Sequence, residues 1–167
     1  MTSGEPHWTA GSDPATLFTA YLDFYRDKAI EKVLGLPADE QDTSRVPSVW
    51  TPLQLLHHLA HMEQRWFVWG FLAEPVEEPY GDEVGGVWGV PPDRGVDDVV
   101  SLLRTTGERT RTVLASYPLD AVASVGGRFS DDPPTLSWIC FHVLQEYARH
   151  VGHLDVAVEL AGGPTGE

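Results

Sequence analysis

The chain has 167 residues, of which 42% are hydrophobic, and its 25 acidic and 11 basic residues give a formal net charge of -14. This length and apolar content are sufficient for one domain with a hydrophobic core, and the acidity argues against partners such as nucleic acid or an anionic membrane surface. The sequence has neither a signal-peptide pattern nor an apolar run near 18 residues, so we expect a cytoplasmic protein without a membrane span.

The first predicted helix follows a lead-in of residues 1–11, which shows no periodicity and is expected to be poorly ordered. Asp13 is a good N-cap and Pro14 suits the first helical position, so the helix is predicted to run from there to Gly35. Four side chains about one turn apart, mostly apolar, form its predicted stripe: Leu17, Tyr21, Phe24 and Lys28.

The second helix is predicted from Pro52 to about Leu72, because Thr51 is a good N-cap and Gln54 completes a capping box. Residues 73–95 are rich in proline and glycine and are therefore predicted to form a long loop. A loop of this length in a compact domain often covers a functional site. Three apolar side chains could pack it against the helices: Tyr80, Val87 and Trp88.

The third helix is predicted over residues 96–116, and the fourth begins near Thr135 and ends near Leu160, before two glycines. Residues 119–134 are expected to be irregular, with a short extended piece around 122–129. The single cysteine, Cys140, is expected in the core. The pattern predicts an all-α, single-domain four-helix bundle spanning residues 1–167, with the long loop between its second and third helices.

Histidine is concentrated in two of the predicted helices. The second helix carries His57, His58 and His61, the fourth carries His142, His150 and His153, and only His7 lies elsewhere. Glu146 and His150 are four residues apart, so they project from the same helical face and can reach one ion, with a third ligand from a facing helix.

Two nitrogens and one carboxylate oxygen suit Zn²⁺ and are tolerable for Ni²⁺, Fe²⁺ or Mn²⁺. Helical geometry permits any of the three histidines of the second helix to be the third ligand. The alternative for each single histidine is ordinary packing on a half-buried face.

These motifs carry a family resemblance. Trp50-Thr51-Pro52 opening a helix, "LLHHLAHMEQRWF" within it, and "QEYARHVGHLD" in the last helix together resemble the DinB-like superfamily of metal-binding four-helix bundles, over about residues 13–160. The resemblance implies a divalent ion held by His58, Glu146 and His150. It also suggests His61 and His153 as neighbours of the metal or the substrate, whereas His57 and His142 are expected to pack.

A glutamate at position 146 is similar to mycothiol-dependent maleylpyruvate isomerase. The chain shows no counterpart of that enzyme's additional C-terminal domain, so the expected activity is closer to a thiol S-transferase. The resemblance implies that the metal activates mycothiol or a similar low-molecular-weight thiol for transfer to a small electrophilic substrate. A homodimer is also possible from the resemblance.

Further candidates lie close to the implied ligands in the sequence. Arg65 and Arg149 could hold a substrate carboxylate, and three tryptophans could line the site: Trp66, Trp69 and Trp88. Two other functions are compatible with the sequence. One is a metal- or small-molecule-binding protein that sequesters a compound without turnover, and the other is a structural helical dimer whose site is vestigial.

Overall fold

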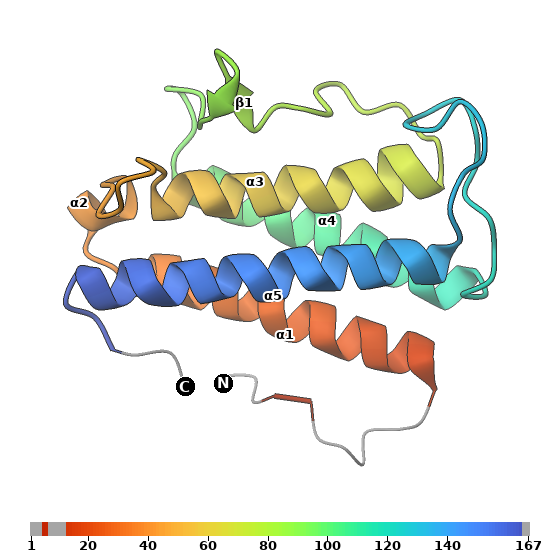
Figure 1. Cartoon of the computed structure of the whole chain (residues 1–167), viewed down its shortest axis with the longest axis horizontal. Coiled ribbons are helices and arrows are strands. Elements are labelled where there is room, and N and C mark those ends of the chain that lie inside the picture. The colour runs from red at the N-terminus through yellow and green to blue at the C-terminus, as the bar shows by residue number, and fades with distance from the viewer. Residues whose placement is uncertain (1–4, 7–12, 165–167) are drawn as a thin grey trace.

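The computed structural model describes residues 5–6 and 13–164, and these residues are mostly helical. Four long helices lie side by side (Figure 1): α1 (Pro14–Leu34), α3 (Pro52–Gln64), α4 (Val96–Ser116) and α5 (Leu136–Leu160). The predicted predominance of helix is confirmed. The predicted lead-in of residues 1–11 lies outside the described residues, apart from residues 5 and 6.

The helices begin where the sequence places capping residues. Asp13 accepts a hydrogen bond from the backbone N–H of Thr16 at 2.8 Å. Thr51 accepts from the N–H of Gln54 at 3.2 Å, and the Gln54 side chain accepts from the N–H of Thr51 at 3.1 Å, which completes the predicted capping box. Thr135 caps α5 in the same manner. These local bonds satisfy N–H groups that have no partner within the helix, and they explain why the predicted starts agree with the structure.

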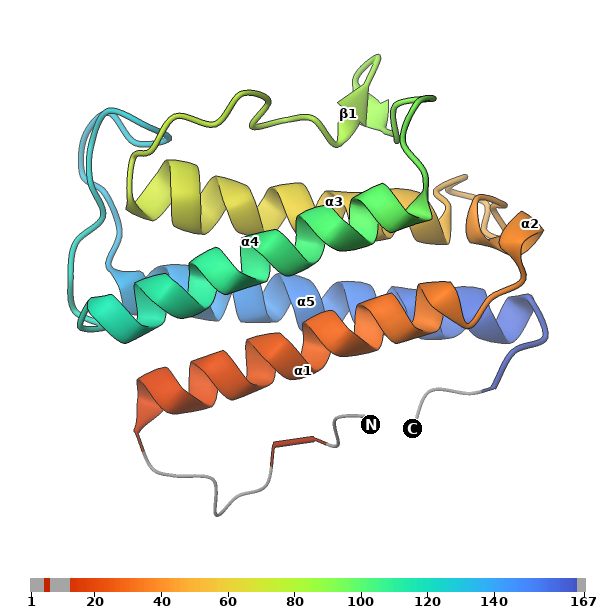
Figure 2. The same cartoon turned by 180° about the vertical axis from the view of Figure 1, so that it is seen from behind.

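The four long helices do not alternate in direction. α3 and α4 run the same way, while α1 and α5 run the opposite way, as Figure 2 shows from behind. Residues 72–95 must therefore return along the whole length of α3 before α4 can begin (Figure 1). This return segment contains a small antiparallel hairpin, β1 (Glu83–Val84) and β2 (Val87–Trp88), which was not predicted.

The second predicted helix changes its winding before it ends. α3 stops at Gln64 and continues as the π-helix η1 (Arg65–Phe71), in which the turn is wider than in an α-helix. Gly70 fits this geometry, because a Cβ atom at that position would lie 2.9 Å from the carbonyl oxygen of Arg65. Short π-helical segments occur often at functional sites, and η1 begins at a residue that contacts the return segment.

The core is formed by apolar side chains from all four long helices. On α1 the core-facing residues are Phe18, Leu22, Arg26, Ala29, Ile30 and Val33. The predicted stripe was therefore wrong as the core face, since its four side chains are only partly buried: Leu17, Tyr21, Phe24 and Lys28. The charged Arg26 lies within the true stripe, and this interrupted the apolar pattern in the sequence.

Arg26 belongs to a buried polar network centred on Glu63, whose side chain is fully buried. Arg26 donates to Glu63 through Nε at 3.2 Å and through Nη2 at 2.7 Å. The hydroxyl groups of Tyr147 and Thr110 also donate to this carboxylate. Gly107 leaves room for the guanidinium, because a Cβ atom there would lie 2.6 Å from Arg26 Nε. The network thus joins all four long helices.

The remaining connections differ in detail from the predictions. A short helix, α2 (Ala38–Gln41), precedes α3 and was not predicted. Instead of the expected extended piece over residues 122–129, the structure has one isolated bridge between Val122 and Thr135. Cys140 is buried in the core as expected, and burial raises the pKa of its thiol to about 12. No helix in the described ranges is long and apolar enough to span a membrane.

Candidate metal centre

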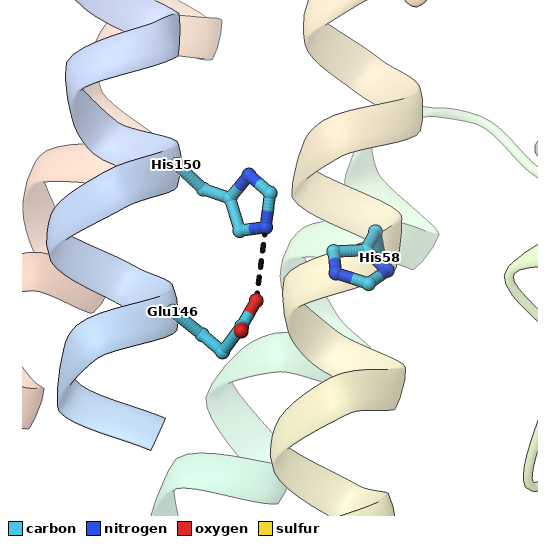
Figure 3. Close-up of side chains that lie close together, drawn as sticks. All are labelled: His58, Glu146 and His150. Carbon is cyan, nitrogen blue, oxygen red and sulfur yellow. Dashed lines mark hydrogen bonds and ion pairs between the residues drawn. The ribbon is translucent and has the colours of Figure 1, made fainter. Parts of the chain in front are cut away.

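Three side chains converge between α3 and α5. Glu146 and His150 lie one turn apart on α5 and point toward His58 on α3 (Figure 3). Each offers one potential ligand atom, and these atoms all lie within 4.8 Å of one another. Nε2 of His150 is 3.1 Å from Oε2 of Glu146. The structure thus brings together the three residues that the family resemblance implies as ligands, while their binding of an ion stays a prediction.

Within the part of the chain that the structure describes, each histidine of the group has one buried ring nitrogen without a hydrogen-bond partner. Nε2 of His58 and Nδ1 of His150 are buried without a hydrogen-bond partner among the described residues. Burial and the neighbouring His58 lower the pKa of His150 to about 4, although Glu146 opposes the shift. The imidazole of His150 is therefore neutral at pH 7, as metal binding requires. The unpartnered Nε2 of His58, beside the Nε2–Oε2 pair of His150 and Glu146, fits a divalent ion with nitrogen and oxygen ligands that would replace the proton of that pair.

The orientation of His58 is set by a carboxylate from the return segment. Nδ1 of His58 lies 2.8 Å from Oδ2 of Asp82, a residue that is 1% exposed. A carboxylate only accepts hydrogen bonds, so Nδ1 carries a ring proton, and in the neutral ring this tautomer leaves the lone pair on Nε2. Arg65 donates to both oxygens of Asp82, with Nη2 at 3.0 Å from Oδ2.

The same contacts determine the charge of Asp82. Burial would raise the pKa of its carboxyl, but the hydrogen bonds from His58 and Arg65 outweigh burial and hold the pKa well below its ordinary value. The carboxylate is therefore ionised throughout the physiological pH range, and its negative charge lies next to Nδ1 of His58.

Of the three candidate tryptophans, only Trp88 contacts the three converging residues in the described part of the chain. Trp88 stacks on His58 with ring centroids 4.0 Å apart and an interplanar angle of 20°, and its ring lies 5.4 Å from that of His150. Trp66 lies against His142, with centroids 4.3 Å apart. Trp69 instead contacts Tyr80 at 5.9 Å. Trp88 therefore covers one side of the three converging residues.

The return segment packs less completely than predicted. Of its three apolar candidates, Trp88 is partly buried against the core, whereas Tyr80 is 49% exposed and Val87 is 68% exposed. The prediction was wrong for Val87, which precedes Trp88 on β2, because successive side chains on a strand point to opposite faces.

The other two histidines of α3 do not join the group. Nε2 of His57 lies 3.1 Å from Nε2 of His61, and Nδ1 of His57 donates to the backbone carbonyl of Gly89 at 2.9 Å. Both side chains are buried. Burial, followed by the influence of His57, lowers the pKa of His61 to about 4. His57 packs as expected, and His61 lies beneath the return segment.

The remaining predicted neighbours lie along α5. Nε2 of His142 is 3.9 Å from Oε1 of Glu146. The ring of His153 lies 5.5 Å from that of His150 and 6.0 Å from that of Trp50. Arg149 is exposed, and it forms no ion pair with any residue that the structure describes. The guanidinium of Arg65 is hydrogen-bonded to Asp82, so it is not free to bind a substrate beside the three converging residues.

Asp82 was not among the residues predicted from the sequence. It contacts His58 from 24 positions away, in a segment that has neither helical nor strand periodicity. No spacing rule relates two such residues, and the only signal was the length of the segment itself, which suggested that it covers a functional site.

Comparison with known proteins adds one match. A family model described as mycothiol-S-transferase matches residues 17–163. This span includes Asp82 and the three converging residues, and it reaches from the first turn of α1 to just beyond α5. No curated protein matches the sequence.

Proposed function

The chain belongs to the mycothiol-S-transferase family of the DinB-like superfamily, and on that premise we propose that it uses a divalent ion to activate mycothiol for transfer to a small electrophile. Family membership supports a thiol S-transferase-like enzyme with a small-molecule substrate. The metal dependence, the ligands and the electrophile are the proposal. Its ligands are His58, Glu146 and His150, and Zn²⁺ is the expected ion.

The observation that carries this proposal is the convergence of two imidazoles and one carboxylate, with donor atoms within 4.8 Å of one another. Three protein ligands leave a coordination position open, which distinguishes a catalytic site from a closed structural one. A divalent ion in this site would lower the pKa of a bound thiol, so that the thiolate is available at neutral pH.

The overall reaction needs no further reactant. In an addition, sulfur bonds to the electrophilic carbon, the π bond of the electrophile breaks and the thiol proton ends on the neighbouring atom. In a substitution, the leaving group departs with its bonding electron pair and the thiol proton is released to water. The protein's part is to hold the reacting groups close together and to exclude water. Asp82 and Trp88 fix the ring of His58 from the side of the return segment.

A group of rings next to Glu146 offers a place for the electrophile. His142 is stacked on Trp138, with centroids 5.3 Å apart and an interplanar angle of 6°, and the ring of Trp66 lies 4.3 Å from that of His142 and 5.5 Å from that of Trp138. Trp138 is 51% exposed. Flat ring surfaces favour flat, conjugated ligands through stacking, so we propose that a planar electrophile binds against Trp138.

Other properties follow from the same proposal. All 167 residues are proposed to form one domain, a four-helix bundle, in a cytoplasmic enzyme. Formation of a homodimer stays a prediction that can be checked from the mass of the protein in solution.

The decisive experiment measures metal and turnover in the same preparation. Protein purified without an affinity tag is analysed for metal, depleted with a chelator and reloaded with Zn²⁺. Loss of mycothiol is then followed with 1-chloro-2,4-dinitrobenzene as the electrophile, and glutathione replaces mycothiol as the control thiol. We expect activity only in the loaded protein. Equal activity before and after depletion would contradict the metal role, and bound metal without turnover would favour a sequestering protein.

A further inference from the structure

Each histidine of α3 contacts the return segment, residues 72–95. His57 donates to the carbonyl of Gly89 and His58 donates to Asp82. His61 lies against Gly81, where an added Cβ atom would come within 2.5 Å of its ring. The three histidines therefore form the surface on which this segment rests. Only one of these contacts reaches a proposed metal ligand, and that contact is made by Asp82.

Asp82 is held from two directions. His58 donates to it from the middle of α3, and Arg65, seven positions later at the start of η1, donates to both of its oxygens. Arg65 also donates to the carbonyl of Pro79 at 3.0 Å, which fastens the chain just before Asp82. The carboxylate and the guanidinium are both buried, at 1% and 7% exposure. Neither group is free to turn toward a substrate.

We infer that Asp82 is a positioning residue of the proposed metal centre and that Arg65 holds it in place. By accepting the Nδ1 proton of His58, Asp82 fixes the tautomer and the ring orientation that present Nε2 to the ion. This inference rests on the metal centre of the proposed function. Carboxylates that orient metal-binding histidines in this way strengthen binding, and their removal weakens metal affinity by about 10–100-fold.

A different role for the same contacts is to fasten the return segment without any effect on the ion. The two roles make different predictions. A positioning residue acts through the ring of His58, so its removal should change metal affinity only while His58 is present. A residue that only fastens the segment should affect the stability of the apoprotein. The effect of its removal should be the same whether or not His58 is present.

The first test is the affinity for Zn²⁺, measured by competition with a chelating indicator. Asp82→Ala should weaken binding by about 10–100-fold. Asp82→Asn should weaken it less, because the amide oxygen can still accept the Nδ1 proton. Glu83→Gln changes the exposed neighbour of Asp82 and should leave the affinity unchanged. Arg65→Gln should lower the affinity without altering any ligand, and it provides a second variant if Asp82→Ala does not fold.

The second test is a double-mutant cycle with His58→Ala. In that background Zn²⁺ is held more weakly by Glu146 and His150, and Asp82→Ala should cause no further loss. Equal losses in both backgrounds, or an affinity of Asp82→Ala and Asp82→Asn equal to that of Glu83→Gln, would overturn the inference. Failure of the wild-type protein to bind Zn²⁺ would instead overturn the proposed metal centre itself.

Discussion

Nε2 of His150 lies 3.1 Å from Oε2 of Glu146, which precedes it by one helical turn on α5. Because a carboxylate only accepts hydrogen bonds, the nitrogen in this pair carries the ring proton. An ion that binds both atoms would take the place of that proton. Metal and proton therefore compete for the same pair of atoms, and metal affinity should fall as the pH is lowered.

Removal of any proposed ligand should abolish stoichiometric metal. His58→Ala, Glu146→Ala and His150→Ala are each expected to purify with far less than one ion per chain, while far-ultraviolet circular dichroism shows nearly unchanged helix content. Elemental analysis measures the ion. Glu159→Ala, which changes an exposed residue near the end of the same helix, should retain it. Full metal occupancy in His150→Ala would show that the ligand assignment is wrong.

Substitution of Trp138 should separate substrate binding from metal binding. If a planar electrophile stacks on this half-exposed ring, Trp138→Ala should raise KM for the electrophile several-fold, because a stacked aromatic contact contributes about 0.5–1.5 kcal/mol. The metal content and KM for mycothiol should not change. Trp138→Phe keeps a flat ring and should recover most of the affinity. An unchanged KM for the electrophile in Trp138→Ala would place the electrophile elsewhere.

The buried Glu63 network gives a prediction about stability. Glu63→Ala leaves the guanidinium of Arg26 buried without its main partner, so the free energy of unfolding should fall by about 3–5 kcal/mol. Urea unfolding measures this change. Glu74→Ala removes a carboxylate from a comparable but exposed pair with Arg109, and its effect should remain below about 1 kcal/mol.

The double variant Arg26→Met with Glu63→Met tests the cause of that loss. It replaces both charges with apolar side chains of similar length and should be less destabilised than Glu63→Ala. If it is equally destabilised, the unpaired charge of Arg26 does not explain the loss, because the double variant has no such charge.

The stability of the metal-free protein should fall as the pH decreases from about 6.5 to 4. The pKa of His61 is about 4 in the folded state because of burial, whereas an unfolded histidine has a pKa near 6.5. Within this range the unfolded chain binds more protons, so unfolding becomes easier as the pH falls. His61→Asn should reduce the slope, by a total on the order of 2–3 kcal/mol across the range. Identical slopes in urea unfolding of the two proteins would contradict this origin.

The features predicted correctly from the sequence are those that depend on near neighbours. The starts of the helices follow from capping contacts between residues three positions apart in the sequence, such as Thr51 and Gln54. The pairing of Glu146 with His150 follows from helical spacing alone. Helical spacing did not select His58 from the three histidines of α3, and it was the resemblance to a family that did so.

The features that were missed depend on contacts between distant parts of the chain. Glu63 reaches Arg26 across 37 positions and Tyr147 across 84. A charged residue in an otherwise apolar stripe looks like an exposed one until its partner is known. The π-helix was also missed, because the residues of η1 continue the apolar pattern of an ordinary helix and only the close approach of Gly70 to the carbonyl of Arg65 marks the wider turn.

The parallel course of α3 and α4 has a consequence for how such a protein can diversify. A chain that must travel back along a helix needs a long connection in any case, and here that connection supplies the side chains that steady a proposed ligand. Replacements, insertions or deletions within residues 72–95 would thus change the contacts that orient His58, while the proposed ligands and the long helices stay as they are. Related enzymes with new preferences for metal or substrate could arise by redesign of this one segment.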